Sequence, residues 1–421
     1  MKHAFDGSRG DTASCPGEWR AGWKVLGAAM LCYICSTMPL TVLGALVKPL
    51  SAEFGWSRAA ITSAFLITAV GTLFLAPVVG HLVDRIGPRR VALFGLPVMA
   101  LGPIAISMAG PSLWTWYACW AIHAFCQAWA GNVIWANVVI GRFDRHRGMA
   151  LAVLLSAHAL TYGALPAFTV FTVAELGWRW VYYLLAAFVL LIAWPIAWRF
   201  IYGVNDGDRG QPASASDVES RFVATPSGAL GDVLKQPQFW QIATAFALAA
   251  LVIAGLFVHF QVVLIDRGMT AMQAAGVAVV LGPASLIGRL GTGLVLDRFT
   301  SNRVAAIALI LPGVSYLILL LGGDWLFGAY LSGFFLGLAG AAESDLMAYL
   351  VSRYFGQHMF GKVYGFLLGL YAIGYGIGPI LAGNVFDRIG SYEPIFIVLA
   401  VAALTGSLLI LALGPPREQK V

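Results

Sequence analysis

Charge is what this sequence has least of. Charged residues make up 11% of its 421 residues, whereas a soluble globular domain carries about a quarter. Hydrophobic residues make up 59%, and the mean hydropathy is +0.80. Because a membrane-spanning helix needs about 20 apolar residues, the chain has room for about a dozen spans and for no large soluble domain besides. This composition excludes most soluble enzyme classes.

Paired cysteines and phosphate-binding loops are also absent. No glycine-rich loop precedes a Lys-Ser or Lys-Thr pair, as ATP-binding loops require. The five cysteines show no metal-ligand spacing, and most lie in apolar runs, where a free Cys behaves as a small hydrophobe: Cys15, Cys32, Cys35, Cys119 and Cys126. We therefore expect no disulfide framework, no metal site, no cofactor and no enzymatic activity.

Long apolar runs bounded by charged residues, Gly or Pro fill the chain. They predict twelve spanning helices, at about residues 22–47, 58–80, 91–110, 113–140, 148–173, 180–202, 238–264, 271–296, 304–322, 326–351, 362–386 and 392–414. The one long polar stretch has the composition of a flexible linker. The sequence thus predicts an all-α membrane protein with a tail over 1–21, an N-terminal six-helix half over 22–202, a linker over 203–236, a C-terminal six-helix half over 237–414 and a tail over 415–421.

The net charge of +6 raises the question of a nucleic-acid partner, which the positions of the basic residues answer. If the N-terminus is cytoplasmic, 20 of the 26 Lys and Arg residues lie on the cytoplasmic side. Only five lie outside: Lys48, Arg58, Arg179, Arg267 and Arg388. This distribution satisfies the positive-inside rule, so the charge indicates topology and no nucleic-acid partner is expected. We predict a bacterial inner membrane protein with both termini and the linker in the cytoplasm.

The two predicted halves repeat each other at a constant offset of 213 residues. GHLVDR at 80–85 matches GLVLDR at 293–298, and Gly177 matches Gly390. Ser57 and Thr270, also 213 apart, are expected to be helix N-caps. Two parallel six-helix repeats with a binding site between them near the bilayer midplane are typical of a secondary transporter.

The segment GHLVDRIGPRR, after the second predicted span, resembles the signature of the major facilitator superfamily. The matching residues are Gly80, Asp84, Arg85, Gly87, Arg89 and Arg90, and the second copy keeps Gly293, Asp297, Arg298 and Arg303. The resemblance covers essentially the whole chain and implies a twelve-helix facilitator. Gly80 would allow close helix approach, and the charges would form a cytoplasmic lock present in one conformation only. The alternative is that these charges only anchor helix ends.

Three further segments resemble bacterial permeases of the monocarboxylate and oxalate/formate exchanger type: EFGWSRAAIT, IGRLGTGLVLDR and ESDLMAYLVSRYFG…FGKVYG. In that family an arginine of the eighth span binds the substrate carboxylate, and Arg289 falls on that position. Animal monocarboxylate carriers have Asp and Lys where this chain has Ser285 and Thr41. The resemblance therefore carries over the anion-binding arginine and not the proton-coupling machinery of those carriers.

Arg289 is also a candidate on physical grounds, because an arginine within a span is costly. It lies eight residues before Asp297, roughly 12 Å from the helix end at about 1.5 Å per residue. A guanidinium there can hold a carboxylate by two parallel charge-assisted hydrogen bonds. The alternative is an internal ion pair with Glu343 or Asp345.

Glu343 and Asp345 are the only carboxylates well inside a predicted span. Two residues apart on a helix, they point about 200° from each other, so at most one is expected to face a central cavity. A carboxyl that alternates between an ion pair and isolation can bind and release a proton. Proton coupling through one of them and a static counter-charge for Arg289 are both open.

Polar and aromatic side chains also recur at helical spacing. His158 and Tyr162, and 213 residues later Tyr371 and Tyr375, are i, i+4 pairs that we expect to face one central cavity and contact a ligand. Gln127 and Asn132 in the fourth predicted span are weaker candidates. Core packing with local hydrogen bonds is the alternative for each.

The sequence therefore predicts a monomeric carrier in the lipid bilayer that moves a small organic anion, a monocarboxylate, by alternating access with proton symport. A carboxylate exchanger and a proton-coupled drug or metabolite exporter are the alternatives. Such exporters usually carry a Gly-Pro-x-x-Gly-Gly element in the fifth span, where this chain reads YGALPAF. A receptor on the same scaffold is a third possibility.

Overall fold

The computed structural model describes residues 16–143, 146–201, 230–296, 298–322, 326–340 and 342–414. The first half comprises α1 (Pro16–Phe54), α2 (Arg58–Thr62), α3 (Ala64–Ile86), α4 (Pro88–Ser107), α5 (Leu113–Ala128), α6 (Asn132–Ile140), α7 (Arg147–Leu155), α8 (Ala157–Leu176), α9 (Trp178–Phe188), a π-helical turn (Val189–Ala193) and α10 (Trp194–Phe200). The second half comprises α12 (Leu230–Leu234), α13 (Pro237–Asp266), α14 (Ala271–Ala278), α15 (Leu281–Leu296), α16 (Ser301–Gly322), α17 (Leu326–Gly340), α18 (Glu343–Ile389) and α19 (Glu393–Leu411). The described regular structure is thus entirely helical, as predicted.

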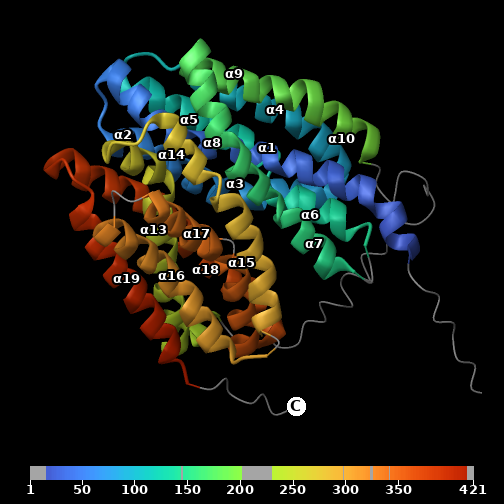
Figure 1. Ribbon diagram of the computed structural model, residues 1–421. Helices are drawn as coiled ribbons and strands as arrows, with labels where there is room; N and C mark the ends of the chain where they lie inside the picture. Colours follow the sequence, from blue (N-terminus) through green and yellow to red (C-terminus); the bar gives the residue numbers. More distant parts are fainter. Residues whose placement is uncertain are drawn as a thin grey trace, which may run out of the picture.

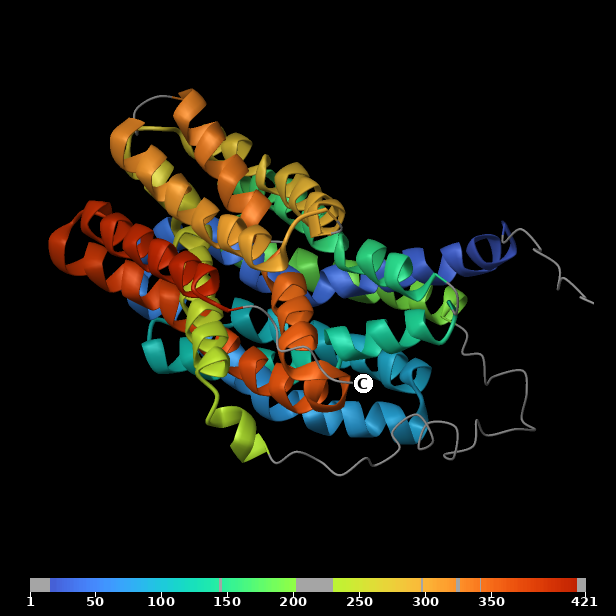
Figure 2. The ribbon, with the colours of Figure 1, turned by 90° about the horizontal axis from the view of Figure 1, so that it is seen from below.

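Eleven helical stretches among the described residues are long and apolar enough to cross a membrane. The prediction of a multi-pass membrane protein is confirmed, and Figure 2 shows most helices running in nearly the same direction. The predicted span over 113–140 is divided into α5 and α6 by tight turns over 129–131, and α5, with 16 residues, is shorter than the about 20 that a span needs. The total of twelve spans stays a prediction.

Each half has its own hydrophobic core. Buried side chains from Val25 to Ile201 form one cluster, which two residues of α13 also join. Two further clusters, from Val233 to Leu413 and from Val252 to Ala403, lie within the second half. Figure 1 shows the corresponding separation, with the blue-to-green helices on one side and the yellow-to-red helices on the other.

Residues 213 apart adopt the same local conformation, as the repeat predicts. Gly55 and Gly268 both have positive φ angles, of 68° and 94°, and so do Gly177 and Gly390, with 90° and 76°. A residue without Cβ reaches this region readily. The predicted N-caps are confirmed: Ser57 accepts a hydrogen bond from the Ala60 N–H and Thr270 from the Gln273 N–H.

The two halves meet at one end of the molecule, which carries Arg58 and Asp266 and is called the Arg58 end. There α18 packs against α2 and α3, and α8 packs against α14 and α15. Toward α7 and the last turns of α15 the ribbons of the two halves diverge (Figure 1). The opposite end, which carries Arg85 and Arg298, is called the Arg85 end.

Three boundaries differ from the predictions. The predicted span over 326–351 ends early, because α17 stops at Gly340 and α18 starts at Glu343. The expected loop over 352–361 is helical, with a kink at Gly356, whose φ angle is 73°. The predicted linker includes α12, while residues 203–229 and both chain ends lie outside the described residues.

Candidate functional site

A cavity of about 380 Å³ lies between the two halves, within the size range of small-molecule sites. Its polar and aromatic lining residues include all seven predicted substrate-binding side chains: Gln127, Asn132, His158 and Tyr162 from the first half, and Arg289, Tyr371 and Tyr375 from the second. Their positions span more than half of the sequence. The tertiary structure therefore brings every predicted ligand contact to one space.

Arg289 projects from α15, and its side chain is only 10% exposed. Its Nε lies 3.7 Å from Oδ2 of Asp345, whose side chain is 41% exposed. Asp345 lines the same cavity. Of the two possible ion-pair partners, Asp345 is thus the one that Arg289 meets in this conformation.

The helix break before Glu343 explains why the two carboxyls differ. Glu343 and Asp345 lie in the first turn of α18, where acidic side chains are favoured by the helix dipole. Glu343 is fully buried and accepts a hydrogen bond of 3.0 Å from the Tyr371 hydroxyl. Its Oε1 has no hydrogen-bond partner among the described residues. Asp345 lines the cavity while Glu343 points away from it, which agrees with the prediction that at most one faces the cavity.

The first-half side of the cavity carries a chain of rings. Tyr33 and His158 lie 4.7 Å apart between ring centroids, and the Tyr33 hydroxyl is 3.5 Å from His158 Nδ1. His158 in turn stacks on Tyr162 at 5.9 Å. Both His158 and Tyr162 also share a smaller space of about 30 Å³ with Arg289. An anion held by Arg289 would therefore lie beside an imidazole and a phenol.

The second-half side repeats this arrangement. Tyr371 and Tyr375 stack at 6.2 Å between ring centroids, and Tyr375 also contacts Phe65 of the first half at 6.1 Å. The two i, i+4 pairs related by 213 residues thus face the same cavity from opposite sides. Gln127 is fixed at the rim, because its Nε2 donates to the Ser36 carbonyl at 2.7 Å.

The sequence analysis missed several lining residues. Tyr33, Thr37 and Thr41 line the cavity from α1, and their spacing of four residues was a readable signal of one helical face. The hydroxyls of Thr37 and Thr41 donate to backbone carbonyls of their own helix. Tyr364 and Phe257 also line the cavity, and nothing in their local sequence separates them from core residues.

The predicted cytoplasmic lock is at the Arg85 end. Arg85, Arg90 and Arg298 are exposed and Arg89 is half-buried, while Asp297 and the side chain of Asp84 lie outside what the structure describes. The lock stays a prediction. The expectation of close helix approach at Gly80 is wrong for this conformation, because a Cβ there would lie 4.0 Å from Val133 Cγ1, an ordinary contact distance.

A membrane protein whose two repeated halves enclose a polar cavity has the architecture of a secondary transporter, a class whose members are not enzymes. The profile of the Major Facilitator Superfamily matches residues 29–327 and 284–421. The chain belongs to this superfamily, as the resemblance implied.

Several characterised relatives resemble the chain over most of its length. It is 23% identical to human monocarboxylate transporter 10 over 93% of this chain and 77% of that protein. It is 24% identical to the gentisate transporter of Corynebacterium glutamicum, covering 88% and 82%. It is 26% identical to the 3-(3-hydroxy-phenyl)propionate transporter of Escherichia coli, covering 86% of each. The three names share an organic anion as substrate.

Proposed function

We propose that the protein transports an organic anion with one carboxylate, and that Arg289 binds this carboxylate. The observation that carries the proposal is the position of Arg289, a largely buried cation that reaches the central cavity. A guanidinium remains charged at any physiological pH and matches a carboxylate in shape. Three relatives named for carrying carboxylic acids support the same substrate class.

The cavity favours an aromatic acid over a two- or three-carbon acid. Its volume of about 380 Å³ far exceeds a small aliphatic carboxylate, and rings of Tyr33, Phe65 and Tyr162 line it beside those of Phe257 and Tyr375. Aromatic side chains pair with a flat ring edge-to-face or offset. The ligand ring would lie between the two tyrosine pairs, with Gln127 and Asn132 at the edge of the site.

In this proposal Asp345 holds Arg289 until a substrate carboxylate replaces it. Glu343 and Tyr371, directly behind the cavity, supply the proton-coupling site. A buried carboxyl with no cation beside it is costly to ionise, so a change in its surroundings during the transport cycle moves a proton. The carrier works as a monomer in the bilayer and alternates between conformations closed at the Arg58 end and at the Arg85 end.

The proposed topology places the Arg58 end outside and the Arg85 end in the cytoplasm, which makes this conformation inward-facing. Membrane-impermeant thiol labelling of Lys235→Cys in intact cells and in inverted vesicles tests it. Labelling only in inverted vesicles supports the orientation, and labelling only in intact cells reverses it.

The substrate proposal is tested by binding of benzoate and 3-phenylpropionate to the purified protein and to Arg289→Gln. We expect the substitution to weaken binding at least about tenfold, because a charge-assisted pair is lost. Lys235→Gln is the matched control, since it removes a cation whose side chain is 80% exposed. Unchanged affinity in Arg289→Gln would remove the central site. Binding of cationic drugs alone would instead favour an exporter.

A further inference from the structure

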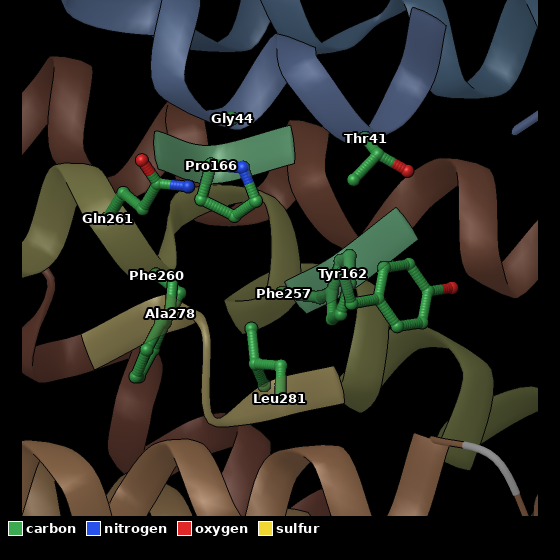
Figure 3. Close-up of a pocket in the computed structure, with 9 residues that line it drawn as sticks. All are labelled: Thr41, Gly44, Tyr162, Pro166, Phe257, Phe260, Gln261, Ala278 and Leu281. Carbon is green, nitrogen blue, oxygen red and sulfur yellow. The ribbon is translucent and has the colours of Figure 1, made fainter. Parts of the chain in front are cut away.

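A second, much smaller pocket lies between the halves next to the central cavity (Figure 3). It has a volume of about 20 Å³ and is lined by Thr41, Gly44, Tyr162, Pro166, Phe257, Phe260, Gln261, Ala278 and Leu281. Thr41, Tyr162 and Phe257 line both spaces, so the small pocket adjoins the cavity directly. Leu281 precedes Arg289 by eight residues, roughly 12 Å along the helix, which puts the pocket on the Arg58 side of the cavity.

Gln261 gives this pocket its polar character. The residue is 7% exposed, and its Oε1 has no hydrogen-bond partner among the described residues. Figure 3 shows its amide beside Pro166, on the opposite side of the pocket from the Tyr162 ring, whose hydroxyl points away. Leaving a buried amide oxygen without a donor costs free energy. A donor that enters the pocket therefore gains a hydrogen bond that the protein itself does not supply.

The remaining wall offers little competition for that donor. Pro166 has no N–H, and the Thr41 hydroxyl already donates to the Thr37 carbonyl at 3.0 Å. The other side chains at the pocket are apolar or aromatic. A volume of about 20 Å³ exceeds the ~10–15 Å³ that one water occupies and is too small for a ring or a carboxylate. The space fits one hydroxyl-sized group.

We propose that this pocket is a subsite that binds one hydroxyl group of the substrate, at the end opposite the carboxylate held by Arg289. This inference rests on the proposed function and narrows its substrate class to hydroxylated aromatic acids. The Gln261 amide accepts from the hydroxyl and donates to it, since an amide carries both functions. A site built to hydrogen-bond a hydroxyl discriminates strongly against the analogue that lacks it.

The test compares matched ligand pairs that differ only in a para-hydroxyl group. The pairs are benzoate with 4-hydroxybenzoate and 3-phenylpropionate with 3-(4-hydroxyphenyl)propionate, whose dissociation constants are measured by calorimetry on the detergent-solubilised protein. We expect the hydroxylated member of at least one pair to bind about three- to tenfold more tightly, as one net hydrogen bond allows. Gln261→Met should remove this preference and leave the affinity for the unhydroxylated acid unchanged.

Thr41→Val is the control, because it removes a polar group of the same pocket whose hydroxyl is already bonded within its own helix. It should keep the preference. Equal affinities within both pairs in the unsubstituted protein, or a preference that survives in Gln261→Met, would overturn the subsite. If Gln261→Met does not fold, Gln261→Leu provides the second variant.

Failure of the subsite is distinguishable from failure of the proposed function. If the acids bind and binding depends on Arg289, but hydroxylation has no effect, only the subsite is wrong. If the acids do not bind, or bind equally well to Arg289→Gln, the proposed function is wrong and the subsite with it.

Discussion

Arg58 Nη1 and Asp266 Oδ2 lie 2.5 Å apart, joining the first half to the second. Lys48 reaches the other oxygen of the same carboxylate at 2.8 Å. The Arg58 guanidinium also lies over the Phe386 ring and donates to the Tyr392 hydroxyl at 2.9 Å. Burial raises the pKa of this hydroxyl, so it stays protonated at physiological pH.

A second carboxylate strengthens the same closure. Asp387, near the end of α18, accepts hydrogen bonds from the backbone N–H groups of Arg58 and Ala59 at 2.9 and 3.0 Å. These groups start α2 and have no partner within that helix. A carboxylate of one half thus caps a helix of the other, and the closure at the Arg58 end combines charge with backbone hydrogen bonds.

Replacing Arg58 with Gln should shift the protein toward the conformation that is open at the Arg58 end. Arg58 is 9% exposed, and removing one partner of a buried pair costs about 3–5 kcal/mol; because Asp266 remains partly solvated, we expect about 1–3 kcal/mol. Distances between spin labels placed on the two halves at the Arg58 end measure the shift. Lys235→Gln removes an exposed cation, with 80% and 67% side-chain exposure in its pair, and should leave the distances unchanged. An unchanged distribution in Arg58→Gln would mean that the pair does not hold this end closed.

Gly383→Ala should loosen the same end by steric conflict. A Cβ on Gly383 would lie 2.5 Å from the Ala59 nitrogen and 2.8 Å from its Cα, and the backbone of α2 must move to accept it. We expect the same change in label distances as in Arg58→Gln. Gly276→Ala is the matched control, because no atom lies within 4 Å of its added Cβ and alanine favours a helix. Identical behaviour of the two alanine variants would contradict this view of the helix contact.

Asp345→Asn should bind carboxylates more tightly. The substitution removes the anion that lies 3.7 Å from Arg289 Nε, so the substrate no longer competes for the guanidinium. We expect a gain of up to about tenfold, measured with benzoate at constant pH. Weaker binding would show that Asp345 orients Arg289 for the substrate and does not compete with it.

Glu343→Gln should separate binding from proton coupling. The amide oxygen can still accept from Tyr371, so the fold and the affinity for benzoate should change less than about threefold. Uptake into vesicles should lose its response to an imposed pH gradient, while exchange between internal and external substrate continues. Gradient-driven uptake that persists in Glu343→Gln would exclude Glu343 as the coupling group and leave Asp345 to be tested in the same assay.

Much of the fold follows from local sequence. Apolar runs of sufficient length must become helices in a bilayer, because no water is present to satisfy the backbone. The repeat offset located Gly55, Gly268 and the two N-caps, since turns and caps depend on one or two residues each. The i, i+4 spacing of His158 with Tyr162 and of Tyr371 with Tyr375 likewise placed each pair on one helical face.

The ion-pair partner of Arg289 did not follow from the sequence. Glu343 and Asp345 are equally acidic and two residues apart, and their different surroundings depend on where α17 ends and α18 begins. A regular helix was the reasonable expectation for this apolar run. The break changes the direction of both side chains, so only the packed structure separates them.

The sequence by itself determined the membrane environment, the repeat and the single arginine available for an anion. The tertiary structure decided which residues meet: Arg58 with Asp266 across 208 positions, and Gln261 with the wall contributed by Pro166. Helix formation and span length depend on neighbours along the chain, which a sequence displays directly. Contacts between the halves depend on how two bundles pack against each other, and that arrangement is the sum of many weak contacts between distant residues.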